Sequence, residues 1–164
     1  MEQDAVDQIV GQWREIRADL DLKAMALVGR LGRVGGLLER AIAAALAKHD
    51  LSIADFDVLA SLRRAGPPHR LNPTHFARAL MLTSGAITNR LDRLAARALI
   101  ERLDDPADRR GTLVALTARG KALVDAAVGD HVANEARLLA ALTRAERTEL
   151  DRLLRKLMAS LEAP

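Results

Sequence analysis

Cysteine is absent from this chain of 164 residues, and aromatic residues make up only 2% of it. Without cysteine the chain can form no disulfide bond, no thiolate metal site and no thiol-based peroxide sensor. It also has no tyrosine, only one tryptophan and two phenylalanines. The apolar content is therefore mostly alanine and leucine, which favours packed helices over sheets.

Long hydrophobic runs are also missing. No segment approaches the roughly 18 apolar residues that a membrane span needs. Residues 1–17 contain acidic residues and no apolar core, unlike a signal peptide. The length suits one domain with a substantial core. We therefore expect a single-domain cytoplasmic protein that does not associate with membranes.

Features of catalytic and cofactor sites are equally scarce. The sequence has no Gly-rich phosphate loop and no nucleophile motif. Its four histidines, at positions 49, 69, 75 and 131, show no i, i+4 pairing that would suit zinc. We expect no metal, no cofactor and no enzymatic activity, and turnover of a bound ligand would revive the enzyme hypothesis.

Charge is unevenly distributed along the chain. Residues 63–121 contain 12 Lys/Arg and 5 Asp/Glu, a net charge of +7 within a chain whose total is +3. The remaining residues therefore carry a net charge of −4. This segregation indicates that the middle of the chain faces an anionic partner.

Apolar periodicity and capping residues predict the order of elements. Helices are expected over about 1–18, 22–49, 52–64, 73–80 and 83–98, followed by two helices after Thr117 and Thr143. Ser52 and Thr83 are the expected N-caps of their helices, and Thr143 and Glu146 form a capping box. The apolar stripe of the first helix consists of Val6, Ile9, Val10 and Trp13. Strands are expected at 99–103 and 112–116, with a polar loop at 104–111 between them. Three glycines inside the second helix, at positions 32, 35 and 36, suggest that it crosses another helix closely.

The helices at 73–80 and 83–98 have helix-turn-helix spacing. The second has an apolar face and a polar face, and small polar residues at its start would let it enter the major groove. Asparagine and arginine can pair there with base edges or phosphates. The alternative is an ordinary amphipathic helix with solvated arginines. The candidate DNA-binding residues on this pair are Thr74, Ser84, Gly85, Thr88, Asn89, Arg90 and Arg93.

The hairpin that follows has a charged tip. Asp108 and Arg110 are two residues apart, so in an extended segment the carboxylate can orient the guanidinium. An oriented arginine at a hairpin tip suits the narrow, electronegative minor groove of A/T-rich DNA. Arg109 suits a phosphate contact. The alternative for Asp108 and Arg110 is a surface salt bridge worth less than about 1 kcal/mol.

The pattern Asp108-x-Arg110-x-x-x-Val114-x-Leu116-Thr117, placed after a helix-turn-helix, resembles the wing signature of the MarR family of bacterial transcription regulators. The resemblance covers almost the whole chain. It implies a mainly α fold with a small β-hairpin wing: a winged helix-turn-helix domain joined to a helical dimerisation region. The DNA-binding lobe would be residues 51–116, with the helix-turn-helix at about 72–98 and the wing at 100–116. Residues 1–49 and 117–162 would form the homodimer interface, although their apolar stripes would equally fit a monomeric helical core.

The additional helix before Leu22 is similar to that of the urate-responsive branch of the MarR family. In that branch a tryptophan on the added helix, an aspartate and two arginines bind the ligand. The positions that correspond here are Trp13, Asp57, Arg90 and Arg102. A flat purine anion needs a stacking surface, an acceptor for ring N–H groups and cationic donors, and these side chains supply them. The alternative is that Asp57 forms a structural ion pair with Arg90 or Arg102, and phenolic acids or other aromatic anions remain open as ligands.

The resemblance implies a homodimeric repressor in the bacterial cytosol, associated with the nucleoid when bound to DNA. It would bind an inverted-repeat operator in double-stranded DNA and be released by a small aromatic or purine anion such as urate. The second hypothesis is a DNA-binding or architectural protein with no small-molecule input. The sequence does not name the operator, the effector or the sign of regulation.

Overall fold

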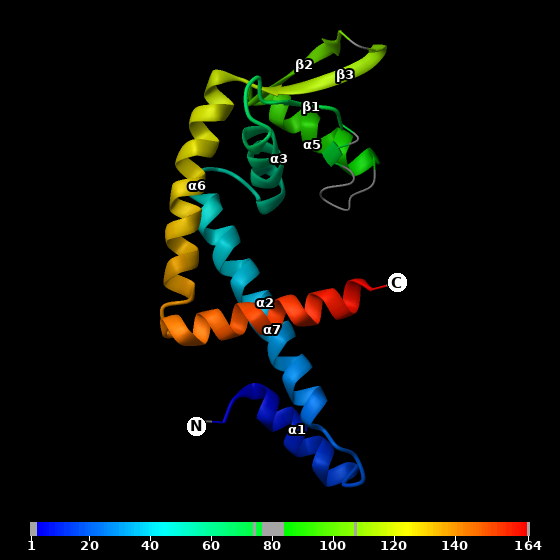
Figure 1. Cartoon of the computed structure of the whole chain (residues 1–164), viewed down its shortest axis with the longest axis vertical. Helices are drawn as coiled ribbons and strands as arrows, with labels where there is room; N and C mark the ends of the chain where they lie inside the picture. Colours follow the sequence, from blue (N-terminus) through cyan, green and yellow to red (C-terminus); the bar gives the residue numbers. More distant parts are fainter. Residues whose placement is uncertain (1–2, 74, 77–83, 107, 164) are drawn as a thin grey trace. The chain divides into compact units, whose positions relative to one another are not determined.

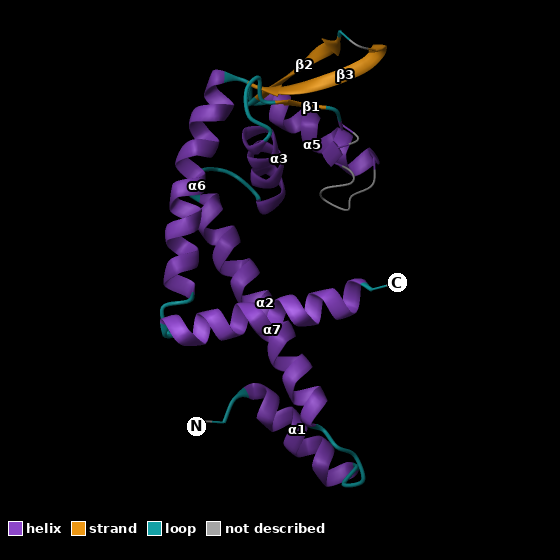
Figure 2. Ribbon diagram, viewed as in Figure 1, coloured by secondary structure: helices purple, strands orange, loops and turns teal. Residues whose placement is uncertain are grey.

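The computed structural model describes residues 3–73, 75–76, 84–106 and 108–163. The chain divides into two compact units, Met1–Ala41 and Ile42–Pro164, here called the N-terminal unit and the C-terminal unit. Helices predominate, and the strands gather in one small sheet (Figure 2). No helix in the described ranges is long and apolar enough to cross a membrane.

The N-terminal unit begins with helix α1 (Ala5–Ile16), which is shorter at both ends than expected. Asp4 caps it by accepting hydrogen bonds from the backbone N–H groups of Val6 and Asp7, at 2.8 and 2.9 Å. The Asp7 carboxylate in turn accepts from the Asp4 N–H, which completes a capping box. Of the predicted stripe, Val6 and Val10 are buried, whereas Ile9 and Trp13 are 52% and 43% exposed.

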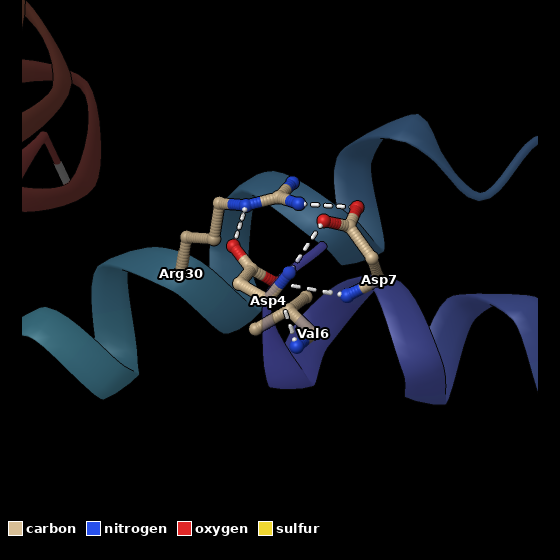
Figure 3. A network of polar contacts seen from close by, with 4 residues as sticks. All are labelled: Asp4, Val6, Asp7 and Arg30. Carbon is tan, nitrogen blue, oxygen red and sulfur yellow. Dashed lines mark hydrogen bonds and ion pairs between the residues drawn. The ribbon is translucent and has the colours of Figure 1, made fainter. Parts of the chain in front are cut away.

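Helix α2 (Lys23–Ala47) is joined to α1 by charge and by a small apolar cluster. Arg30 donates to the Asp4 carboxylate at 2.7 Å and also to Asp7, so that one guanidinium holds both carboxylates of the capping box (Figure 3). Val6, Val10 and Leu22 pack together beside this network. The two carboxylates that cap α1 therefore also attach this helix to α2.

The close approach on α2 is not at the expected glycines. A Cβ added at Gly29 would lie 3.3 Å from Cγ1 of Val6, which is a tight contact. Among the described residues, nothing lies within 4 Å of a Cβ added at Gly32 or Gly35, and only the Arg40 side chain approaches Gly36. Within this chain, α2 therefore meets another helix closely one turn before the three glycines.

The C-terminal unit contains helix α3 (Ile53–Arg64), which begins and ends as expected. The Ser52 hydroxyl accepts from the Asp55 N–H at 3.1 Å, and residues 65–68 end the helix. Pro73, His75 and Phe76 are helical, and Phe76 is fully buried. The rest of the first helix of the pair, including Thr74, lies outside the described residues, as does Thr83, the expected cap of helix α5 (Ser84–Ala96).

A three-stranded antiparallel sheet follows, in the order β1-β3-β2 (Figure 1). Strand β2 spans Ile100–Asp105 and β3 spans Asp108–Leu116, while β1 (Arg70–Leu71) pairs with the far edge of β3. The polar loop expected at 104–111 is wrong, because pairing continues to Asp105 opposite Asp108. Backbone hydrogen bonds pair the strands at this end of the hairpin, although apolar and polar residues do not alternate there. Because strands are predicted from that alternation, the polar sequence showed no sign of them.

The start of helix α6 (Ala118–Leu138) packs against the backbone that leads into β2. The Thr117 hydroxyl caps it by accepting from the Gly120 N–H at 3.0 Å and donates to the Ala98 carbonyl at 2.8 Å. A Cβ added at Gly120 would lie 1.9 Å from the carbonyl oxygen of Leu99. Glycine is therefore required at this contact between α6 and the backbone that leads into the wing.

The main core lies in the C-terminal unit, between α3, α5, α6 and the sheet. Leu59, Leu62, Phe76 and Leu94 are completely buried there. Helix α7 (Arg144–Glu162) begins with the predicted Thr143–Glu146 capping box but has no buried residue. The fold is mainly helical with an antiparallel wing, as the sequence predicted.

Candidate functional site

Helix α5 has the two faces that a recognition helix needs. Ile87, Leu91 and Leu94 are 2%, 1% and 0% exposed and anchor the helix in the core. The opposite face is exposed at four of the predicted DNA-binding positions, Gly85, Thr88, Asn89 and Arg93. The side chain of Ser84 lies outside the described part of the structure. A rigid helix with a small, polar outer face has the shape and chemistry for a DNA groove.

The wing lies next to this helix. Strand β2 packs against α5, and the β2–β3 hairpin extends away from it (Figure 1). The backbones of Asp108, Arg109 and Arg110 are extended and lie at the start of β3, directly after the turn. Their side chains are outside the described part of the structure. The backbone therefore presents all three residues at the tip of the hairpin, where the sequence placed them.

Two arginines of the basic middle segment hold the fold together. Arg97 donates to the backbone carbonyl of Asp50 at 2.8 Å and to its carboxylate at 3.1 Å. Arg102 forms an ion pair with Asp92 at 2.8 Å, which joins β2 to α5. Arg102 was predicted to bind ligand, which stays a prediction, and in this structure its guanidinium pairs with Asp92.

Asp57 and Arg90 lie in each other's electrostatic field. Burial raises the pKa of the Asp57 carboxyl, and the nearby charges of Arg64 and Arg90, and of His131 when it is protonated, oppose that rise. The Nε of Arg90 is buried without a hydrogen-bond partner in the described residues. Asp57 likewise forms no ion pair with any residue that the structure describes, so the alternative of a structural Asp57–arginine pair is not seen here. Both groups therefore keep hydrogen-bonding capacity for a ligand.

The predicted ligand-binding residues are divided between the two units. Asp57 and Arg90 both belong to the C-terminal unit and interact electrostatically. Arg102, in the same unit, pairs with Asp92. Trp13 belongs to α1 of the N-terminal unit, where its side chain is 43% exposed. The part of the predicted pocket that can be described is thus the one around Asp57.

A cavity of about 290 Å³ opens beside Asp57, between α3 and α6. Three polar residues that line it were not predicted from the sequence: Arg63, Arg64 and His131. Phe56 and Val128 supply apolar walls. The cavity combines cations, an acceptor and flat apolar surface, which is the set of properties that an aromatic anion requires.

One wall of this cavity is fixed by a shared carboxylate. Asp125 on α6 accepts from Arg63 at 2.6 Å and from Lys121 at 2.8 Å. Hydrogen bonds from Lys121 and Arg63 hold the pKa of Asp125 below its ordinary value. Arg63 and Asp125 are 62 positions apart along the chain, so no local motif could have indicated this wall. Within the described ranges, no group of three His, Cys, Asp or Glu side chains could hold a metal ion.

Comparison with known proteins identifies the family. A protein-family model, described as the MarR family, matches residues 49–111 of the sequence. The HTH-type transcriptional regulator PecS of Dickeya dadantii is 40% identical over 149 residues, which cover 91% of this chain and 90% of PecS. A mutant of Escherichia coli MarR, solved with operator DNA, superposes with a TM-score of 0.71 at 32% identity, over 83% of this chain and 96% of that one.

A third relative was solved in a study of ligand control. Bordetella bronchiseptica BpsR, whose DNA binding is regulated by 6-hydroxynicotinic acid, superposes with a TM-score of 0.69 at 29% identity. The match covers 83% of this chain and 93% of BpsR. The identity to PecS over nine-tenths of both chains and the shared fold agree with the wing signature. The chain therefore belongs to the MarR family and is a DNA-binding transcriptional regulator, not an enzyme.

Proposed function

We propose that this regulator is a homodimeric repressor that reads an inverted-repeat operator with α5 and the wing, and that a small aromatic anion such as urate releases it. The observation that carries the DNA-binding part is the polar, exposed face of α5 beside an extended hairpin with Arg109 and Arg110 at its tip. The proposed groove contacts are Gly85, Thr88, Asn89 and Arg93 on α5, with Asp108, Arg109 and Arg110 on the wing.

Duplexes selected from a random pool by the full-length protein test this arrangement. The bound duplexes should contain two half-sites about one helical turn apart. Arg110→Ala should weaken binding about tenfold, since each good groove contact contributes about 1–3 kcal/mol. Arg152→Ala on α7 is the matched control, because Arg152 is 59% exposed and pairs with Glu149 on its own helix. Unchanged affinity of Arg110→Ala would remove the wing from the interface.

The dimer is supported by the apolar faces that the chain leaves uncovered. On α7, Leu153, Leu157 and Leu161 are 47%, 41% and 76% exposed, and no residue of this helix is buried. A second copy of the chain is the occupant that the family resemblance implies, and an isologous interface would cover the same face on both copies. Leu157→Glu should shift the sedimentation coefficient from dimer to monomer, and a wild-type monomer would exclude the proposed assembly.

The ligand part rests on the unpaired polar groups around Asp57. Asp57 offers an acceptor, and Arg90 offers a cation whose Nε has no partner among the described residues. Because Arg90 also belongs to α5, a ligand that binds it could reposition the recognition helix. A coupling free energy of about 1–3 kcal/mol would change DNA affinity roughly 5–150-fold.

A fluorescence titration tests this part, since Trp13 is the only tryptophan in the chain. Urate should quench its emission to saturation and release bound DNA, and both responses should disappear in Asp57→Asn. The matched control is Asp151→Asn, a change of the same kind at an exposed carboxylate on α7 that pairs with Arg155. No response to urate or to phenolic acids would favour the alternative, a regulator or architectural protein without a small-molecule input.

A further inference from the structure

His131 on α6 lines the cavity beside Asp57, but the proposed function assigns it no role. We propose that His131 is a specificity-determining residue of the cavity between α3 and α6, where its Nδ1 accepts a hydrogen bond from a ring N–H of the ligand. The cavity would then select heteroaromatic anions that carry a ring N–H over simple aromatic carboxylates. This inference rests on the proposed function and extends the site to a residue of α6.

The hydrogen-bond partner of the other ring nitrogen sets the tautomer of His131. Its Nε2 lies 3.2 Å from the carboxylate of Glu135, one turn later on the same helix. An ionised carboxylate only accepts hydrogen bonds, so in the neutral form of the imidazole, which is the form that would bind the ligand, the hydrogen is on Nε2. Nδ1 is then left with a lone pair and acts as an acceptor.

That acceptor is buried and unused. Nδ1 of His131 has no hydrogen-bond partner in the described part of the chain, although it is shielded from solvent. The ring is held against Phe56, with centroids 4.9 Å apart and planes tilted by 49°. A buried acceptor without a partner is unfavourable, and a donor on a bound ligand would satisfy it.

The neighbouring side chains define what kind of ligand would bring that donor. Asp57 lines the same cavity and is a second acceptor, so a ligand with more than one N–H can satisfy both groups. Arg64 also lines it and donates to the buried Ser61 hydroxyl at 3.2 Å. Arg63 and Arg64 make the site favourable for an anion, and Phe56 offers a ring for aromatic contact. A flat anion with ring N–H groups matches this combination.

The test is a calorimetric titration of the full-length protein with urate, which has ring N–H groups, and with benzoate, which has none. Wild-type protein should bind urate more tightly than benzoate. His131→Phe keeps a ring beside Phe56 but removes the acceptor, so the dissociation constant for urate should rise about tenfold while that for benzoate stays unchanged. His131→Asn places a carbonyl oxygen near the position of Nδ1 and should restore most of the urate affinity.

His49→Phe is the matched control. The side chain of His49 is 17% exposed, like that of His131, and its Nε2 lies 2.8 Å from Asp130 on α6. It does not line the cavity, so both affinities should stay at their wild-type values in this variant.

The outcomes separate this inference from the proposed function. Wild-type protein that binds neither urate nor benzoate would overturn the proposed effector site and this inference with it. Wild-type protein that prefers urate, with the same preference in His131→Phe, would leave the effector site standing and overturn the role of His131. Equal losses of urate and benzoate affinity in His131→Phe would also overturn it, because a selective acceptor cannot affect a ligand without a donor.

Discussion

In the C-terminal unit Leu59, Leu62 and Leu94 are completely buried, whereas in the N-terminal unit Leu27 and Val28 are 62% and 66% exposed. Both units have helices with apolar stripes of the same period. In the C-terminal unit the sheet, α3, α5 and α6 cover those stripes from within the chain. Among the described residues of the N-terminal unit, the buried apolar cluster is the small one around Val6. An apolar stripe therefore predicts a helix and its face, but not what covers that face.

Core truncations provide the largest contrast between the units. Leu94→Ala should lower the free energy of unfolding by about 4 kcal/mol, because it removes a completely buried side chain from a close-packed core. Val10→Ala, in the small cluster of the N-terminal unit, should cost about 1–2 kcal/mol and loosen α1 alone. Urea unfolding followed by circular dichroism measures the first effect, and Trp13 fluorescence reports the second. Equal losses would mean that the two units form one cooperative core.

Two glycines in helices give the next contrast. Gly120→Ala should lower the free energy of unfolding by about 3 kcal/mol, because its Cβ would lie 1.9 Å from the Leu99 carbonyl oxygen, and backbone must move to admit it. Gly32→Ala should raise stability by about 0.5–1 kcal/mol, since alanine is the better helix former and nothing described lies within 4 Å. Thermal unfolding of both variants measures the difference. Destabilisation by Gly32→Ala would place a second surface, such as the proposed partner copy, against this part of α2.

The parts of the fold that were predicted correctly depend on local chemistry. The caps at Ser52 and Thr143 were predicted because a capping side chain bonds within three residues of itself. The extension of the paired strands to Asp105 and Asp108 and the existence of strand β1 were not predicted. Polar residues form the outer pairs of the ladder, Asp104 opposite Thr112 and Asp105 opposite Asp108, and a strand of two residues has no periodicity to detect.

The candidate site shows the same limit. The exposed polar face of α5 was predictable because a helical period defines it within one segment. His131 was missed because it meets Phe56 and Asp57 only through the packing of α6 on α3, more than 70 positions away. The ion pair between Arg102 and Asp92 was not predicted either, because only the docking of β2 on α5 reveals it. Contacts between distant segments are set by tertiary packing, and no single sequence pattern encodes them.

The smallest expected effect concerns the charge network that attaches α1 to α2. The hydrogen bond from Arg30 is the main reason why the pKa of Asp4 falls from its ordinary 3.8 to about 2, and the pKa of Asp7 is lowered by the same guanidinium. A carboxyl whose pKa is lowered by folding stabilises the folded state above its unfolded pKa. That stabilisation is lost as the pH falls through its folded pKa. The attachment of α1 should therefore weaken between about pH 4 and pH 2, and Trp13 emission should change over that range.

Arg30→Met should produce the emission of the loosened helix already at neutral pH, since the side chain keeps an unbranched apolar stem but loses both ion pairs. Arg33→Met, at an exposed position on the same helix outside the network of Figure 3, should behave like the wild type. Because the C-terminal unit does not contain this network, its unfolding at neutral pH should not change in either variant. A wild-type acid transition that persists unchanged in Arg30→Met would show that Val6, Val10 and Leu22, and not the charges, hold α1 in place.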